Sequence, residues 1–381
     1  MRQAVIVQAY RTAIGKKGGI WKEVAPEYLA AEVMKKLIRE QAIDPSQIDE
    51  VILGNAVGPG GNLSRLAALQ AGFPAHVPGV TIDRQCGSGL EAINLAARLV
   101  QAGAGEIYLA GGVESTTRAP LKMEMLEGQE EPRIYSRARF SPEEIGDPEM
   151  GEAAENVAEA YEVSREEQDD YARLSYQKAI YSKETGVFEQ EIVAIHEIVE
   201  DESPRVTSNY NKLLPRMKPV FRPQGTVTAG NSCGLNDGAA VALVMSREKA
   251  EHLRLLPLLV FVDAVAVGVD PNYLGIGPVP AIKKLLQRNH LTIEDIDLIE
   301  FNEAFASQVI ASLKQLDIPW NKVNLGGGAI ALGHPYGASG AILVTRLCRE
   351  MLRNQAMYGI ATLGIGGGIG VATLFRSYSG A

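Results

Sequence analysis

Apolar residues along the chain fall into short continuous runs that alternate with stretches of helical period. The runs AVIVQA from Ala4, VILGNAV from Val51 and EIYLAGG from Glu106 have the length and composition of buried strands. Residues 28–40 and 90–100 instead place apolar residues at helical spacing. This alternation predicts an α/β protein with a mostly parallel sheet covered by helices on both faces.

An internal repeat divides the chain into similar parts. Residues 48–56 (IDEVILGNA) resemble 296–304 (IDLIEFNEA), and 86–100 resemble 336–352. We therefore expect two similar βαβ-type halves, residues 1–115 and 245–381. The segment between them, 116–244, is richer in Glu, Arg and Pro and does not fit the repeat.

That middle segment has one clear helix start. Ser164 and Glu167 form a capping-box pattern, which predicts a long helix to about Lys183. An insertion of this kind after a strand is a natural lid or ligand-binding domain. A surface excursion with no ligand role is the alternative.

Composition and charge limit the molecules that the protein is expected to bind and the compartment in which it is expected to work. The 381 residues are 46% hydrophobic and 22% charged, as in an ordinary globular protein. A formal net charge of −9 argues against nucleic acid as the main partner. Three widely spaced cysteines give neither a disulfide framework nor zinc spacing, which favours a reducing compartment such as the cytoplasm and no metal. We also expect no signal peptide and no membrane span.

Cys86 lies in the sequence DRQCGSG, after the strand-like GVTI and before a helical pattern. A cysteine at a helix N-terminus is expected to favour the thiolate, which is a strong nucleophile. The alternative is a buried structural cysteine, since free cysteines are often buried. The adjoining Gly-Ser-Gly and the helix start favour the nucleophile.

His334 is one of five histidines and lies in NLGGGAIALGHPYGASG, between two glycine-rich turns and before a helix start. Glycine allows a ligand to approach the backbone closely. Cys86 and His334 occupy equivalent strand-to-helix turns of the two halves, so packing of the halves about a pseudo-twofold axis would bring them together. A neutral imidazole there could take the proton of the thiol.

The motifs as a set resemble those of the thiolases, the family of acetyl-CoA acetyltransferases and 3-ketoacyl-CoA thiolases. The resemblance covers the whole chain. It rests on DRQCGSG around Cys86, GNSCGLNDGAA from Gly230, NEAFA from Asn302, GGAIALGHPYGASG from Gly327 and GIGGGIG from Gly364. It implies two halves stacked as αβαβα layers, with the inserted loop domain binding coenzyme A. It also implies a homodimer or homotetramer, a place in fatty acid metabolism, and no cofactor besides coenzyme A as substrate.

The resemblance implies a role for each of four positions. Cys86 would be the nucleophile that becomes acylated, and His334 the base that activates it. Asn302 would hold a water that joins His334 in an oxyanion hole. Backbone N–H groups of Cys86 and Gly366 would form a second hole for the thioester carbonyl. A turn-capping role for Asn302, and a plain tight turn for the glycines of 364–370, are the alternatives.

Four further positions match coenzyme A contacts of the family. Arg205 would bind the nucleotide end, and Met150, Ala229 and Ser232 would line the path of the pantetheine. A solvated surface charge is the alternative for Arg205. Ser232 and Ala229 could equally be turn and packing residues.

This chain departs from the family where a second catalytic cysteine is replaced by Gly364. That cysteine usually moves the proton at the substrate α-carbon, and general acid–base catalysis is worth about 10²–10⁴-fold. Cys233, where the family usually has serine, could supply the thiol, or Glu303 could hold a water in its place. Cys233 could also simply replace a small serine. Glu149 and Leu274, where the family often has His and Met, leave the size of the substrate open.

Three other functions remain as alternatives. Gly230 to Gly234 match the G-x-S-x-G nucleophile elbow, with Ser232 as the nucleophile of a serine hydrolase between a strand and a helix. Residues 87–92 match a GxGxxA dinucleotide fingerprint. A thiolase-like protein without the second cysteine could also bind acyl-CoA, or transfer or hydrolyse acyl groups, without carbon–carbon chemistry.

Overall fold

The computed structural model describes residues 2–135, 137–206 and 208–378, and its centre is a ten-stranded sheet. The strands follow one another across the sheet in the order β10-β11-β12-β9-β1-β8-β5-β3-β4, and β2 pairs with β8. The strands of this sheet are β1 (Ala4–Arg11), β2 (Gly15–Lys16), β3 (Glu50–Gly54), β4 (Gly79–Ile82), β5 (Ile107–Ser115), β8 (Asn236–Ser246), β9 (Leu259–Gly268), β10 (Leu298–Phe301), β11 (Tyr358–Ile365) and β12 (Ile369–Ser377).

The sheet is mixed, so the expectation of a mostly parallel sheet was wrong. β3 pairs in parallel with β4 and β5, and β10 pairs in parallel with β11. The other neighbours are antiparallel, including the hairpin that joins β11 and β12 through a tight turn at residues 366–368. Alternation of strands and helices predicted only the βαβ units, and gave no signal for the long antiparallel strands between them.

Strand β8 also changes one predicted boundary. Residues 236–244 were expected in the insertion, but β8 pairs with β1 and β5 inside the N-terminal half. The chain therefore leaves this half after β5 and returns to it with β8. The rest of the division into two halves and an insertion stays a prediction.

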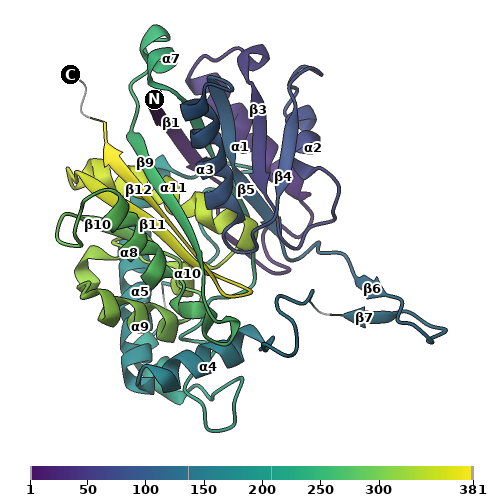
Figure 1. Cartoon of the computed structure of the whole chain (residues 1–381), viewed down its shortest axis with the longest axis vertical. Helices are drawn as coiled ribbons and strands as arrows, with labels where there is room; N and C mark the ends of the chain where they lie inside the picture. Colours follow the sequence, from purple (N-terminus) through teal and green to yellow (C-terminus); the bar gives the residue numbers. More distant parts are fainter. Residues whose placement is uncertain (1, 136, 207, 379–381) are drawn as a thin grey trace.

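The helices build five layers with the two parts of the sheet. α1 (Pro26–Glu40) and α2 (Leu63–Gln70) cover the outside of the N-terminal half, and α8 (Pro278–Arg288) and α9 (Ala306–Leu316) cover the outside of the C-terminal half. α3 (Ser88–Ala102) and α11 (Tyr336–Arg353) lie together in the central layer, and both are buried in one shared apolar core. The predicted αβαβα stack is confirmed, and Figure 1 shows it with β9, β11 and β12 on one side and β3, β4 and β5 on the other.

Glycines allow α3 and α11 to pack unusually closely. A Cβ atom on Gly340 would lie 2.3 Å from the backbone N of Leu90, and one on Gly89 would lie 2.6 Å from the carbonyl oxygen of Gly337. Contacts this short leave room for hydrogen only, so the glycines fix the distance between the two helix starts. Because Cys86 and His334 immediately precede these helices, the same contacts set how far apart the two turns that carry them lie.

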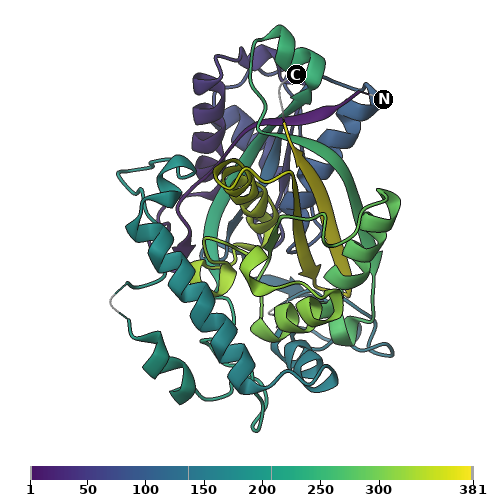
Figure 2. The same cartoon turned by 90° about the vertical axis from the view of Figure 1, so that its left-hand side faces the viewer.

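The insertion contributes helices and a projecting hairpin. The remaining elements are β6 (Lys122–Glu124), β7 (Arg133–Tyr135), α4 (Met150–Ala160), α5 (Arg165–Glu184), α6 (Tyr210–Leu213), α7 (Arg247–His252), α10 (Ala329–Leu332), and the 3₁₀ helices η1 (Pro45–Gln47), η2 (Val187–Gln190), η3 (Leu214–Arg216), η4 (Pro271–Ile276) and η5 (Trp320–Lys322). The capping box at Ser164 and Glu167 is present, and α5 follows it as predicted. In Figure 1 the β6–β7 hairpin extends away from the body, and Figure 2 shows the long teal helix α5 crossing one face.

A buried ionic cluster ties the insertion to β1. Arg11 donates hydrogen bonds to Glu191 (2.7 and 2.9 Å) and to Asp201 (2.7 and 3.0 Å), and all three side chains are buried. The ion pairs compensate the charges of these three side chains, each of which would be costly to bury without a partner. Within the described ranges no helix is both long and apolar enough to cross a membrane.

Candidate active site

Cys86 lies in a strained turn between β4 and α3. Gln85, directly before it, has φ at 47°, a left-handed conformation that is uncommon for a residue other than glycine. The hydroxyl of Ser88 holds this turn, accepting a hydrogen bond from Arg84 N (2.8 Å) and donating to the carbonyl of Gln85 (2.6 Å). The turn therefore presents Cys86 at the N-terminus of α3, as the sequence predicts.

The thiol of Cys86 is neutral in the resting protein. Burial raises its pKa to about 12, although hydrogen bonds from the backbone N–H groups of Cys86 and Gly366 act in the opposite direction. The expectation that the helix N-terminus alone would favour a thiolate was wrong, because loss of hydration outweighs it. The sulfur therefore needs a base before it can attack a carbonyl.

His334 has the properties of such a base. Burial lowers its pKa to about 3, so the imidazole is neutral. Its Nδ1 lies 2.6 Å from Oγ of Ser339, and its Nε2 lies 3.4 Å from Nδ2 of Asn302. Since an amide Nδ2 can only donate, Nε2 is the acceptor and Nδ1 carries the proton. The backbone N–H of His334 is held by Asn236 Oδ1 at 3.0 Å.

Asn302 and Gly366 come from neighbouring parts of the C-terminal half. The backbone N–H of Asn302 donates to Thr362 O in β11 at 3.0 Å, and Gly366 follows the end of this strand. Gly366 is covered by the ring of Phe140, which would lie 2.9 Å from a Cβ atom at that position. The structure thus gathers Cys86, His334, Asn302 and Gly366 at the edge where the two halves meet.

The two suggested replacements for the missing thiol differ in their surroundings. Cys233 is half-buried and close enough to Cys86 for the two sulfurs to interact electrostatically, and burial raises its pKa to about 12. Glu303 is buried with both carboxylate oxygens taken by four protein donors, namely the side chains of Tyr171, Ser175 and Asn324 and the backbone N–H of Ile330. This geometry argues against Glu303 as the holder of a catalytic water.

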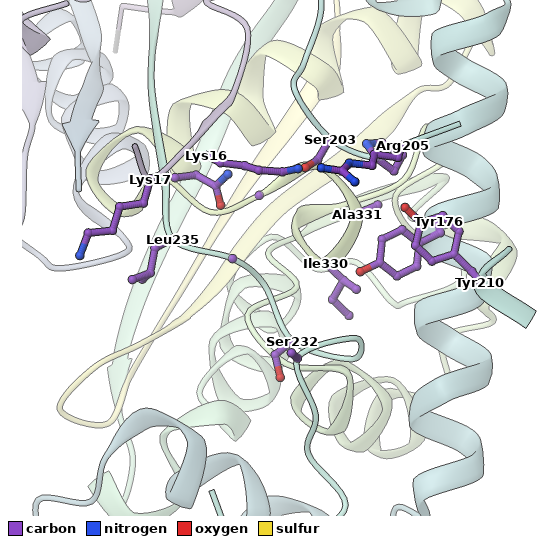
Figure 3. A pocket seen from close by; sticks show the side chains of 15 residues that line it. Lys16, Lys17, Tyr176, Ser203, Arg205, Tyr210, Ser232, Leu235, Ile330 and Ala331 are labelled. Carbon is purple, nitrogen blue, oxygen red and sulfur yellow. The ribbon is translucent and has the colours of Figure 1, made fainter. Parts of the chain in front are cut away.

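An open cleft of about 450 Å³ leads away from this site. It begins beside Ser232, Asn236 and Gly333, the last of which directly precedes His334. Its other end has the basic residues Lys16, Lys17 and Arg205. In Figure 3, Lys16 and Arg205 approach each other at one end, while Ser232 lies towards the opposite end.

Two stacked tyrosines form part of the cleft wall. The rings of Tyr176, on α5, and Tyr210 are 3.9 Å apart and nearly parallel. Such a surface suits a flat apolar group, and the nearby cations suit an anion. Three of the four predicted coenzyme A contacts, Arg205, Ala229 and Ser232, line the cleft, whereas Met150 at the start of α4 is not among its lining residues.

The two short motifs of the alternative enzymes have other structural roles. Residues 230–234 lead directly into strand β8 rather than a helix, so the strand–turn–helix context of a serine nucleophile elbow is wrong for Ser232. In the dinucleotide-like motif, Gly87 and Gly89 pack closely against Ile365 and Gly337. Their lack of side chains is explained by protein contacts.

Several residues of the site were not predicted from the sequence. Ser339 lies inside the quoted motif around His334, so its spacing could have suggested a partner for the imidazole. Lys16 and the tyrosine pair come from distant segments, and only the fold brings them to the cleft. Gln308, in the first turn of α9, matches no motif that would single it out in the sequence.

Comparison with known proteins agrees with this geometry. The family model described as thiolase, N-terminal domain, matches residues 4–248, and that described as thiolase, C-terminal domain, matches residues 255–377. A Bacillus subtilis (strain 168) protein named "Putative acetyl-CoA C-acetyltransferase YhfS" is 50% identical, over 98% of this chain and 99% of its own. A Staphylococcus epidermidis protein named "Putative acetyl-CoA C-acetyltransferase VraB" is also 50% identical, over the full length of both.

A solved structure shows the same architecture. The crystal structure of the Bacillus anthracis acetyl-CoA acetyltransferase superposes with a TM-score of 0.94 at 41% identity, covering 99% of each chain. The fold is therefore an α/β thiolase fold. With both domain models matched along nearly its whole length, the chain belongs to the thiolase family.

Proposed function

We propose that this protein is an acyl-CoA acyltransferase that works through an acyl group on Cys86. The observation that carries the proposal is that the neutral groups Cys86 and His334 stand at the starts of α3 and α11, which are in close contact. Backbone N–H groups of Cys86 and Gly366 converge there on the sulfur. A neutral imidazole can take the proton of a neutral thiol, and fixed donors stabilise the negative charge that develops on a carbonyl oxygen.

The proposed reaction is thiolysis of a 3-ketoacyl-CoA. Nε2 of His334 takes the proton of Cys86, and the thiolate attacks the C3 carbonyl carbon. The C2–C3 bond breaks, its electron pair remains on C2 as an enolate, and protonation of C2 releases acetyl-CoA. Coenzyme A then gives its thiol proton to the group that protonated C2, and its sulfur attacks the acyl-cysteine. The shortened acyl-CoA leaves, and the sulfur of Cys86 takes its proton back from Nε2 of His334. The reverse sequence is a Claisen condensation of two acyl-CoA molecules.

The proton for C2 needs a donor that Gly364 does not supply. Cys233 is the group that we assign, because its thiol is protonated at neutral pH and lies within electrostatic reach of Cys86. Coenzyme A would lie in the open cleft, with its phosphates near Lys16 and Arg205 and its pantetheine passing Ala229 and Ser232. No cofactor besides this substrate enters the scheme.

The same proposal includes self-association in the cytoplasm. Four apolar side chains on or beside the β6–β7 hairpin, Leu121, Met123, Met125 and Ile134, are 58–80% exposed, which suits contact with a second copy of the chain. Strand β4 ends the sheet, and Leu66 and Leu69 are exposed on the neighbouring helix α2. These features support a homodimer or homotetramer, and three free cysteines support a reducing compartment.

The deciding experiment is thiolysis of acetoacetyl-CoA with added coenzyme A, followed by loss of the substrate's enolate absorbance. Turnover in the native protein that disappears in Cys86→Ala would support the proposal. Cys233→Ser then tests the proton donor, and undiminished turnover in that variant would exclude the thiol. No turnover above the Cys86→Ala control would count against carbon–carbon chemistry on this substrate.

A second function is favoured by Gly364, which has no titratable group. The protein could transfer or hydrolyse acyl groups, or bind acyl-CoA, without breaking a carbon–carbon bond. Intact mass after addition of acetyl-CoA separates the cases. One acetyl group replacing a hydrogen adds about 42 Da. An adduct of this mass that is absent in Cys86→Ala, in a protein that does not turn over acetoacetyl-CoA, would favour acyl transfer. No adduct and no turnover would favour binding alone.

A further inference from the structure

The space beside Gly364 is filled by the side chain of Gln308. A Cβ atom on Gly364 would lie only 2.3 Å from Nε2 of Gln308 and 3.3 Å from its Cδ. Gln308 lies in the first turn of α9, and its Cβ and Cγ pack against Gly275. The carboxamide therefore stands where any side chain at residue 364 would begin.

This carboxamide is buried without a protein partner. Gln308 is 1% exposed, and neither Nε2 nor Oε1 makes a hydrogen bond with any described residue. Buried amides are usually hydrogen-bonded, because an unpaired donor or acceptor loses its hydration without compensation. In this orientation of the carboxamide, the donor Nε2 is the atom that faces Gly364.

The carboxamide also lies beside the reaction site. The carbonyl of Thr362 accepts from the backbone of Asn302, and the N–H of Gly366 reaches the sulfur of Cys86. Gly364, near the end of β11, lies two positions after Thr362 and two positions before Gly366. Two positions correspond to roughly 6–7 Å along an extended chain. Gln308 thus lies beside the strand segment whose two ends contact Asn302 and Cys86.

We propose that Gln308 contacts the substrate and takes the place of the side chain missing at Gly364. Nε2 donates a hydrogen bond to a carbonyl oxygen of the bound acyl group, most strongly when that oxygen carries the negative charge of the enolate. No proton is transferred through Gln308, because a neutral amide is neither an acid nor a base near neutral pH. The inference rests on the proposed function for the identity of the ligand.

The first test separates substrate contact from a structural role. Gln308→Met keeps the length and volume of the side chain but removes both polar atoms. We expect kcat for acetoacetyl-CoA thiolysis to fall about 10²-fold, the loss typical of one oxyanion donor, with a smaller change in KM. Ser312→Ala, a buried polar deletion one turn further along α9, is the matched control and should retain native turnover and melting temperature.

Binding measurements keep the test independent of turnover. In the Cys86→Ala background, we expect Gln308→Met to weaken binding of acetoacetyl-CoA several-fold in calorimetry, and to leave binding of coenzyme A, which has no acyl oxygen, unchanged. If the native protein turns nothing over but this selective loss is seen, the proposed function fails and the contact stands. Equal weakening of both ligands, or no change in either binding or turnover, would overturn the contact.

The geometry makes a second, sharper test possible. Gly364→Ala places a methyl group on the site of the carboxamide and should displace it, causing a loss of kcat like that of Gln308→Met. The double variant should be no worse than either single one, because both changes remove the same contact. Additive losses in the double variant would show that the two residues act independently and would contradict the proposal.

Discussion

Nδ1 of His334 lies 2.6 Å from Oγ of Ser339, in the first turn of helix α11. Because Nδ2 of Asn302 donates to Nε2, Nδ1 carries the proton and donates it to the Ser339 hydroxyl. The orientation of the base is therefore set by a residue five positions away, on the helix that also fixes the spacing of the two halves.

Ser339→Ala should slow the reaction without weakening binding. The neutral hydrogen bond that it removes is worth about 0.5–1.5 kcal/mol, and its loss lets the imidazole turn or change tautomer. We expect kcat for acetoacetyl-CoA thiolysis to fall up to about 10-fold, with KM unchanged. Ser339→Thr, which keeps the hydroxyl, should recover part of the loss. Equal rates in the native and Ser339→Ala proteins would show that the hydroxyl does not orient His334.

The acylation step should be insensitive to pH over a wide range. Burial lowers the pKa of His334 to about 3 and raises that of Cys86 to about 12. The base is thus unprotonated above about pH 4, and the thiol stays protonated below about pH 11. We expect kcat/KM for acyl transfer to Cys86 to be flat between about pH 5 and 9. A step near pH 6–7, as an unperturbed histidine would give, would contradict a buried neutral imidazole.

Arg205→Ala should weaken binding of coenzyme A derivatives. Arg205 is exposed at the basic end of the cleft, where each surface charge is worth up to about 1 kcal/mol. We expect KM for acetoacetyl-CoA to rise about 2- to 5-fold at low salt, with kcat unchanged. The truncated substrate acetoacetyl-pantetheine, which lacks the nucleotide, should show no difference between the two proteins.

The matched control for that variant is Lys284→Ala, which removes an exposed cation from α8, outside the cleft. Its KM should equal that of the native protein. A similar rise in both variants would indicate a general effect of net charge, and a rise with the pantetheine substrate would place Arg205 near the acyl end instead.

Arg11→Ala should strongly destabilise the protein. The substitution would leave Glu191 and Asp201 buried with one cation fewer, a change that typically costs about 3–5 kcal/mol. We expect a large fall in the midpoint of urea unfolding. Arg2→Ala, which removes a pair with Glu106 that is about half exposed, should change the free energy of unfolding by less than about 1 kcal/mol. Similar effects of the two substitutions would contradict a role for burial.

Sequence patterns predicted the layers of helices and strands better than they predicted which strands pair within the sheet. The repeat between residues 86–100 and 336–352 placed Cys86 and His334 at equivalent turns, and the structure has α3 and α11 packed together in the central layer. The direction of β8 and its place in the N-terminal half were not predictable, because its partners lie more than a hundred residues away. An apolar run shows that a strand is buried and says little about its neighbours.

At the site, the sequence predicted the chemical groups but not their charge states. The position of Cys86 at a helix start suggested a thiolate. Burial instead raises the pKa of the thiol, and that burial depends on how the other half of the protein covers the sulfur. Gln308 could not be chosen from the sequence either, since its importance comes from filling the space beside Gly364, which only the fold reveals. Properties that arise from contacts between distant segments need the folded structure.

Gly340→Ala should test whether the packing of α3 on α11 sets the geometry of the site. The added Cβ would lie 2.3 Å from the backbone N of Leu90, so the helices must move apart. Overpacking of this kind typically costs about 1–3 kcal/mol in stability. Because Cys86 and His334 precede these helices, a shift of the order of 1 Å could lower acylation of Cys86 about 10²-fold. Gly268→Ala, whose Cβ would have no neighbour closer than 3.9 Å, is the control and should leave both quantities nearly unchanged. A Gly340→Ala protein that is destabilised but acylated at the native rate would show that the distance between the helices does not control the Cys86–His334 pair.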